Sequence, residues 1–165
     1  MNKWDTSRKI AATLTLILLG IGYLAGMAKL FSSVGLEPEN VKAHYSPRTE
    51  PEDPEERMAM LLETAPEMSG EKLAHVAHVH MIPYTIVFAL CAFFVIHFEW
   101  PPRAQIVFMA LFALSIPMDF LSMAATRFIH PAFYAGIIFS GAVYGVCVGV
   151  TILWSLYELW ISETG

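Results

Sequence analysis

Four long apolar runs constrain the fold of this chain more than any other feature of its sequence. They extend over about residues 10–31, 76–98, 104–128 and 131–161. Each approaches or exceeds the roughly 20 residues that an α-helix needs to cross the hydrocarbon core of a bilayer. The chain is 56% hydrophobic and 15% charged, which is too few charges for a soluble domain of this size. We therefore expect an all-α integral membrane protein, a four-helix up-and-down bundle that forms a single domain over residues 1–165.

Basic residues near the N-terminus predict the orientation of the bundle. Lys3, Arg8 and Lys9 precede the first run, and Arg103 lies in the short second loop. Because Lys and Arg gather on the cytoplasmic side, we expect both termini in the cytoplasm of a bacterium and residues 32–75 as an outer loop in the periplasm. The first run is long for a secretory signal, so we expect a retained helix in the inner membrane. An aromatic belt is expected at the cytoplasmic interface, made of Trp4, Trp100, Trp154, Tyr157 and Trp160.

Glycines recur at four-residue spacing in the first and last runs. They are Gly22 and Gly26 in the first, and Gly141, Gly145 and Gly149 in the last. Such spacing places small residues on one helix face, where a neighbouring helix or a flat cofactor can approach closely. Helix packing is the simpler interpretation.

The outer loop is acidic. Between residues 32 and 72 it carries ten of the fifteen acidic residues and four basic ones. Such a charge would steer a positively charged partner, for example a soluble periplasmic cytochrome c. Asp53, Pro54 and Glu56 predict the start of a short amphipathic helix. Prolines elsewhere in the loop predict extended, irregular chain.

Histidines gather on the outer side of the predicted bundle. The topology brings the start of the second helix, with His75, His78 and His80, to the level of His130 at the start of the fourth. On a helix His75 and His78 are neighbours, whereas His80 points about 160–200° away from each. One site therefore cannot use all three histidines. Two separate sites, or one site with a supporting histidine, is the better interpretation.

A haem b site is the chemistry that this pattern favours. Haem b in a bundle needs two axial imidazoles from facing helices, and we expect His78 and His130 to supply them. Arg127 would meet a propionate, and Gly141 would admit the ring. Asp119 lies deep inside the third run, where a carboxylate is a functional candidate by default. It would orient a ligating histidine or carry a proton.

Other interpretations stay open. With Met81, Met118 and Met123 nearby, the same histidines could hold copper or zinc. They could also simply bind water and headgroups, with His130 capping the turn before Pro131. A third possibility is a structural or assembly subunit of a respiratory complex. The sequence has no nucleophile elbow, zinc-protease helix, phosphate-binding loop or basic nucleic-acid surface, which favours a non-catalytic role and excludes nucleic acid as a partner.

Short motifs add a resemblance. "GLEPENVKAHYSP", "HVHMIP", "IPMDF" and "GAVYGV...LYELW" resemble a family of small four-helix bacterial inner-membrane proteins associated with cytochrome-based respiratory chains. Some similar proteins carry a haem c segment in the outer loop, which this chain lacks. Carried over by position, the resemblance implies that His78 and His80 are the paired histidines and that Asp119 matters, and it leaves His75 and His130 outside the pattern. It implies a larger electron-transfer complex as the setting.

Overall fold

The chain folds into a bundle of four long helices. The structure, a computed structural model, describes residues 4–33, 37–46, 53, 55 and 69–162. The long helices are α1 (Thr6–Ser33), α4 (Gly70–Val95), α5 (Pro102–Phe128) and α6 (Tyr134–Trp160). All four are long and apolar enough to cross a membrane, and the described residues contain no strand. The predicted all-α, four-helix membrane fold is confirmed.

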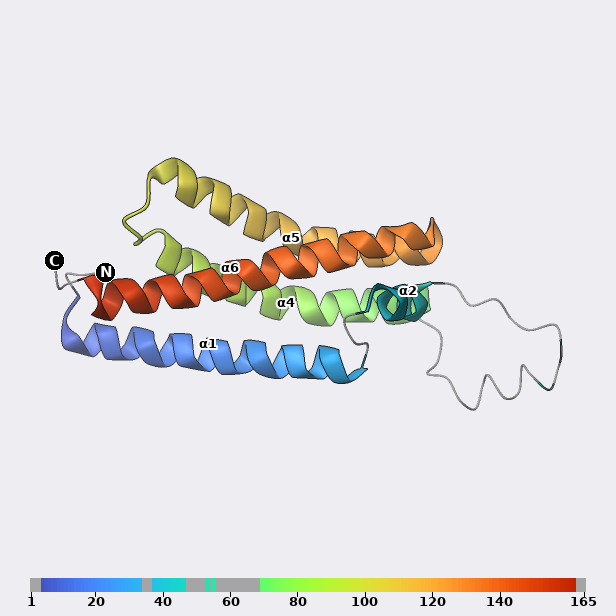
Figure 1. The fold of residues 1–165 in the computed structure, drawn as a ribbon, viewed down its shortest axis with the longest axis horizontal. Helices are drawn as coiled ribbons and strands as arrows, with labels where there is room; N and C mark the ends of the chain where they lie inside the picture. The colour runs from blue at the N-terminus through green and yellow to red at the C-terminus, as the bar shows by residue number, and fades with distance from the viewer. Residues whose placement is uncertain (1–3, 34–36, 47–52, 54, 56–68, 163–165) are drawn as a thin grey trace.

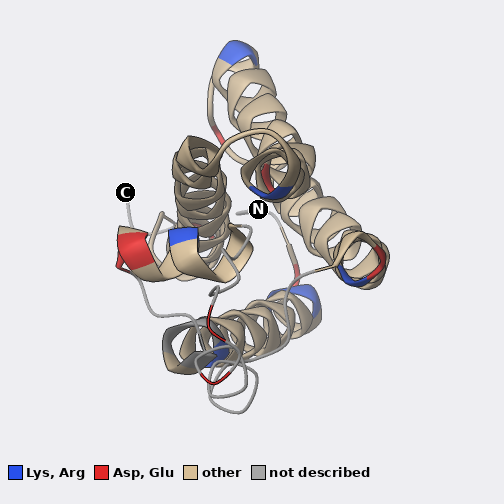
Figure 2. Cartoon of the chain, turned by 90° about the vertical axis from the view of Figure 1, so that its right-hand side faces the viewer, with Lys and Arg blue, Asp and Glu red and all other residues tan. Residues whose placement is uncertain are grey.

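The four helices run up and down along one long axis (Figure 1). The N- and C-termini lie at the same end, which we call the terminal end, and the opposite end, where α4 and α6 begin, is the loop end. Seen from the loop end, charged residues occupy the ends of the helices, α2 and the connections, whereas the lengths of the helices are largely uncharged (Figure 2). This distribution suits a bundle whose outer surface faces lipid.

Local signals explain where the helices begin. The side chain of Ser69 accepts a hydrogen bond of 3.1 Å from the backbone N–H of Lys72, so α4 starts at Gly70 and not at the predicted residue 76. Pro102 opens α5. The fourth apolar run is not one continuous α-helix, because a short 3-10 turn, η1 (Pro131–Phe133), precedes α6.

The loop contains a helix, α2 (Pro38–Tyr45), in a stretch that the sequence predicted to be extended. Glu37 is extended and Pro38 occupies the first turn, which is the usual place for proline in a helix. α2 packs against α5, α6 and η1 at the loop end. The amphipathic helix predicted after Asp53 lies outside the described residues, except that Asp53 Oδ1 accepts a hydrogen bond of 2.9 Å from the N–H of Glu55.

Packing is uneven around the bundle. α5 and α6 share the most extensive contact, and α4 packs against both of them. α1 packs against α6, and Figures 1 and 2 both place it to one side of the other three helices. Its inner residues Ala12 and Leu16 join a buried cluster with Phe94, Val95 and Leu159. α1 is therefore the most peripheral of the four long helices.

The glycine faces contribute less to packing than their spacing predicted. A Cβ atom on Gly145 would clash with the hydroxyl of Tyr23, so this glycine does admit α1. Gly22, Gly26, Gly141 and Gly149 have open space around them. The closest contact between α5 and α6 uses a glycine outside the pattern, because a Cβ atom on Gly136 would overlap Ser122.

Aromatic side chains close the terminal end, as the predicted belt requires. The rings of Trp100 and Trp154 lie 5.4 Å apart, and Trp4 packs edge-on against His97 at 5.5 Å. Trp160 Nε1 donates a hydrogen bond of 2.9 Å to Thr13 Oγ1, which joins α6 to α1.

Candidate functional site

Asp119 is the central residue of the candidate site. It lies on α5 in the half nearer the loop end, and its Oδ1 accepts a hydrogen bond of 3.0 Å from Ser140 Oγ of α6. Ser140 is fully buried, with 0% of its surface exposed. Asp119 makes no ion pair with a basic residue in the part of the chain that the structure describes. The expectation that this carboxylate faces the interior of the bundle agrees with its position.

A small cavity of about 40 Å³ adjoins the Asp119 carboxylate. Its polar lining comes from three helices: Tyr84 of α4, Ser115 of α5, and Ser140 and Tyr144 of α6. A water molecule needs roughly 10–15 Å³ of such space and two to four polar partners, so this cavity can hold a few waters at most. The arrangement surrounds one carboxylate with hydroxyl groups.

Helix α2 adds a third phenol to this group. Tyr45, the last residue of α2, packs beside Leu73 of α4 and Met123 of α5. Burial raises the pKa of the Tyr45 phenol to about 12, and the negative charges of Asp119 and then Tyr84 act in the same direction. Helix α2 therefore covers the Asp119 site on the side of the loop end.

Two prolines lie next to this site. Pro83 precedes Tyr84 within α4, and Pro117 lies two residues before Asp119 within α5. A proline inside a helix removes one backbone N–H and the hydrogen bond that it would make, and bends are common there. Two of the three helices that line the cavity, α4 and α5, therefore lack a backbone hydrogen bond near its level.

Comparison with known proteins identifies the membrane domain. Residues 35–165 match the Aq_1264_TM family, described as a transmembrane helical domain. The chain belongs to this family. The matched range contains α2, α4, α5 and α6, which are the helices that surround Asp119, and leaves out α1. No curated protein and no solved structure matches the chain.

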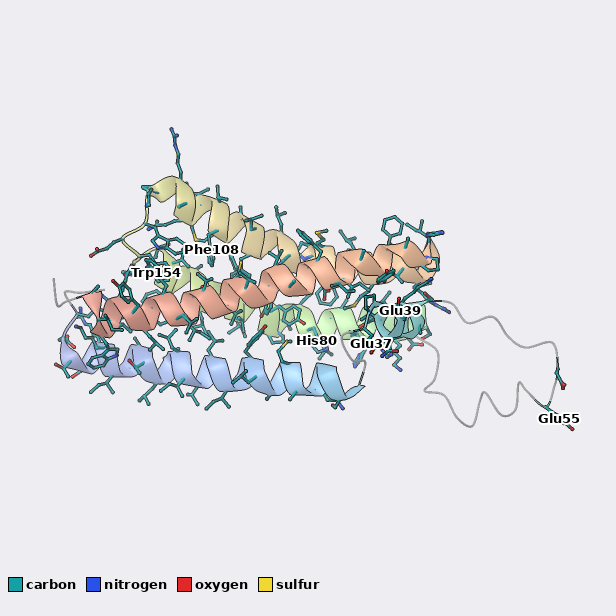
Figure 3. The ribbon with its side chains drawn as sticks, viewed as in Figure 1. Glu37, Glu39, Glu55, His80, Phe108 and Trp154 are labelled. Atoms are coloured by element: carbon teal, nitrogen blue, oxygen red, sulfur yellow. The ribbon has the colours of Figure 1, made fainter. Side chains whose placement is uncertain are left out.

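The three histidines of α4 lie on exposed positions. α4 already includes His75, so all three have helical geometry. The interior stripe of α4 runs through Leu73 and Tyr84, and the spacing places His80 on it, whereas His75 and His78 lie off it. The His80 ring lies 5.9 Å from that of Tyr84, and Figure 3 shows His80 in the part of α4 nearer the loop end. Within the described chain His78 makes no hydrogen bond or ring contact.

His130 has a capping role in this structure. Its Nδ1 accepts a hydrogen bond of 3.1 Å from the backbone N–H of Ala132, at the start of η1. The ring is exposed, and Arg127, one turn earlier in α5, is half-buried. No contact joins His130 to His78 among the described residues. Those residues also contain no cluster of three or more His, Cys, Asp or Glu side chains suited to a metal.

Sequence reasoning missed the hydroxyl groups around Asp119. Ser140 and Tyr144 are one helical turn apart, and Tyr84 follows His80 by one turn, so helical spacing was an available signal. Tyr45 gave no such signal, because its segment shows no clear helical periodicity.

Aromatic rings continue from this site through the bundle. Tyr84 and Tyr144 lie 4.8 Å apart, and Tyr144 and Phe112 lie 5.2 Å apart. Phe108 packs against the buried cluster that contains Phe112, and it lies 5.5 Å from Trp100. The path therefore runs from His80 to Trp154, residues that Figure 3 shows on opposite halves of the bundle.

Proposed function

We propose that the protein is a non-catalytic membrane subunit of a bacterial electron-transfer complex, placed in the inner membrane with its loop end in the periplasm. It would exchange electrons with a quinol or a cytochrome. The observation that carries the proposal is the path of packed aromatic rings from Tyr84 and Tyr144 in one half of the bundle to Trp100 and Trp154 in the other, which would bridge redox groups of partner subunits without being oxidised itself. The motif resemblance to proteins of cytochrome chains supports the same setting.

Aromatic packing alone would also stabilise a membrane bundle, so an experiment has to separate electron transfer along the path from the packing role of its rings. Removal of single rings from the path, compared with removal of a ring outside it, makes that separation.

A haem b held by His78 and His130 does not fit this structure. A ligating histidine normally donates its second ring N–H to a neighbour, whereas His130 Nδ1 accepts a hydrogen bond. The remaining nitrogen of a neutral ring then carries the proton and has no lone pair for iron. His78 is exposed, and the cavity of about 40 Å³ is far too small for a porphyrin. We therefore do not place a haem of the proposed complex between His78 and His130.

The loop end is suited to a cationic protein partner. Glu37 and Glu39 are exposed on α2 and lie at this end of the bundle (Figure 3). Together with the other acidic residues of the loop sequence they would attract a basic soluble cytochrome c. Because salt screens such attraction, the rate of electron transfer to cytochrome c should fall as the ionic strength rises to physiological values. A rate that is independent of salt would exclude electrostatic docking.

The test uses the complex purified from native membranes through a tag on this chain. We expect a reduced-minus-oxidised absorption spectrum with a chromophore that quinol reduces, and transfer of its electrons to cytochrome c. Tyr144→Leu and Trp100→Leu each remove one ring from the path, so both should slow transfer. Phe139→Leu, at a position that is 58% exposed on α6, is the matched control and should not. A purified complex without any redox chromophore would refute the proposal.

A structural role in the same complex is the second candidate, and one observation favours it. α1 offers many exposed large apolar side chains, among them Leu14, Leu18 and Leu24 at 56%, 69% and 67% exposure. Lipid or a neighbouring subunit can cover this face equally well. Loss of the complex on removal of α1, with the aromatic-path variants fully active, would support the structural role. A copper or zinc site has no specific observation in its favour.

A further inference from the structure

Among the residues that the structure describes, the Asp119 carboxylate is withdrawn from solvent without a basic partner. The described titratable groups that face it from the elements packed around it are phenols: Tyr45 of α2, Tyr84 of α4 and Tyr144 of α6. Phenols are neutral at physiological pH. A carboxylate that loses water without gaining a countercharge is strongly disfavoured, and such groups commonly take up a proton instead.

The hydrogen bonds of Ser140 favour a proton on Asp119. Ser140 Oγ lies 3.0 Å from Asp119 Oδ1 and also 3.0 Å from the carbonyl oxygen of Ile137. A hydroxyl has one hydrogen, so it cannot fully satisfy two acceptors. If Asp119 is protonated, its O–H donates to Ser140, and Ser140 donates to Ile137. Each hydroxyl hydrogen of this group then has one acceptor.

Helix α2 closes the site on the loop side. Tyr45 packs against Leu73 and Met123, and α2 as a whole rests on α5, α6 and η1. The cavity beside Asp119 has room for the water that a proton needs as a carrier. Pro83 and Pro117 weaken the two facing helices at the same level.

We propose that Asp119 is a proton-binding site that holds its proton while α2 is seated and exchanges it with the loop side when α2 lifts. This role follows from the contacts of Asp119 and needs no electron transfer. The proton passes between the Asp119 carboxyl and water in the cavity, so no co-reactant is needed. Sodium is the other monovalent cation that an oxygen-lined site could take, and the test separates the two.

Infrared difference spectroscopy on the full chain in lipid nanodiscs at neutral pH tests the proposal. We expect the C=O band of a protonated carboxyl, shifted by D2O, that is lost in Asp119→Asn and kept in the control Asp5→Asn, an exposed residue paired with Arg8. Retention of every carboxyl band in Asp119→Asn would overturn the proposal. Loss of the band on adding NaCl, but not choline chloride, would make the site a sodium site and overturn the proton assignment.

Three further variants guard against misfolding and test whether α2 covers the site. Ser140→Ala keeps Asp119 and should shift the band, because the carboxyl loses its partner, whereas an unshifted band would show that it belongs to another group. Tyr45→Ala should speed the hydrogen–deuterium exchange of the band several-fold relative to Tyr45→Phe. Equal exchange in these two variants would refute α2 as the cover.

Discussion

Two carboxylates are withdrawn from solvent in different halves of the bundle, and their surroundings differ. Glu158 of α6, at the terminal end, is 4% exposed. Its Oε1 accepts a hydrogen bond of 3.0 Å from the N–H of Glu99 and one of 2.7 Å from Trp154 Nε1. Asp119 accepts one hydrogen bond, from a hydroxyl that has a second acceptor, and borders a cavity. Burial alone therefore does not reveal the role of a membrane carboxylate, because the donors around it decide that role.

The terminal end also contains a buried cation, whereas basic residues are absent from the described contacts of Asp119. Lys9 of α1 is 6% exposed, and its Nζ lies 5.9 Å from the centre of the Trp160 ring. A cation over an indole ring is an attractive contact. Charges at the terminal end therefore serve to join α1, α6 and the turn between α4 and α5. We regard that end as the structural anchor and the loop end as the functional one.

The largest effect should follow removal of the anchor. Glu158→Ala leaves the N–H groups of Glu99 and Trp154 without their acceptor, and each unsatisfied buried donor costs about 1–3 kcal/mol. We expect the free energy of unfolding to fall by about 3 kcal/mol, measured by thermal or denaturant unfolding in mild detergent. An unchanged value would show that water replaces the carboxylate and that Glu158 is no anchor.

A somewhat smaller effect should appear where α5 meets α6. A Cβ atom on Gly136 overlaps Ser122, so Gly136→Val should reduce the free energy of unfolding by about 2 kcal/mol. Gly149→Val is the matched control, since nothing lies within 4 Å of its added Cβ. Equal losses in both variants would mean that helix propensity and not packing sets the cost.

The smallest effect concerns Tyr45 and pH. The pKa of Tyr45 is raised from 10.0 to about 12, so docking of α2 favours the protonated phenol. The stabilisation of docked α2 by the protonated phenol is fully present below about pH 10 and is lost as the pH rises toward 12. A nitroxide on Ala43→Cys in α2 should therefore become more mobile over this range. Tyr45→Phe should remove the pH dependence, and a persistent transition in that variant would assign it to another group.

The helices could be predicted from sequence, and the site largely could not. Apolar runs of about 20 residues leave few alternatives to membrane-spanning helices. Ser69 also marks the start of α4 for a physical reason, its hydrogen bond to Lys72. In contrast, Glu158 meets a backbone N–H 59 positions away, and no local pattern signals such a contact.

The histidines show the same limit more sharply. Helical spacing correctly separated His80 from His75 and His78, because that follows from the geometry of one helix. Which face of α4 points inward depends on how α4 packs against its neighbours. The spacing of the three histidines alone does not reveal that face. The continuous stripe from Leu73 through His80 and Tyr84 was the usable signal.

The most direct test of the comparison measures two isosteric variants side by side. Asp119→Asn and Glu158→Gln each replace an ionisable carboxyl by a neutral amide and keep an accepting oxygen. At neutral pH in the same detergent, we expect Glu158→Gln to lower the free energy of unfolding by about 1 kcal/mol, because hydrogen bonds to a charged acceptor are stronger than those to a neutral one. We expect Asp119→Asn to leave the free energy of unfolding unchanged or to raise it, because Asp119 already holds a proton and has no basic partner among its described contacts. An equal loss in both variants would show that the two carboxyl groups are in the same state.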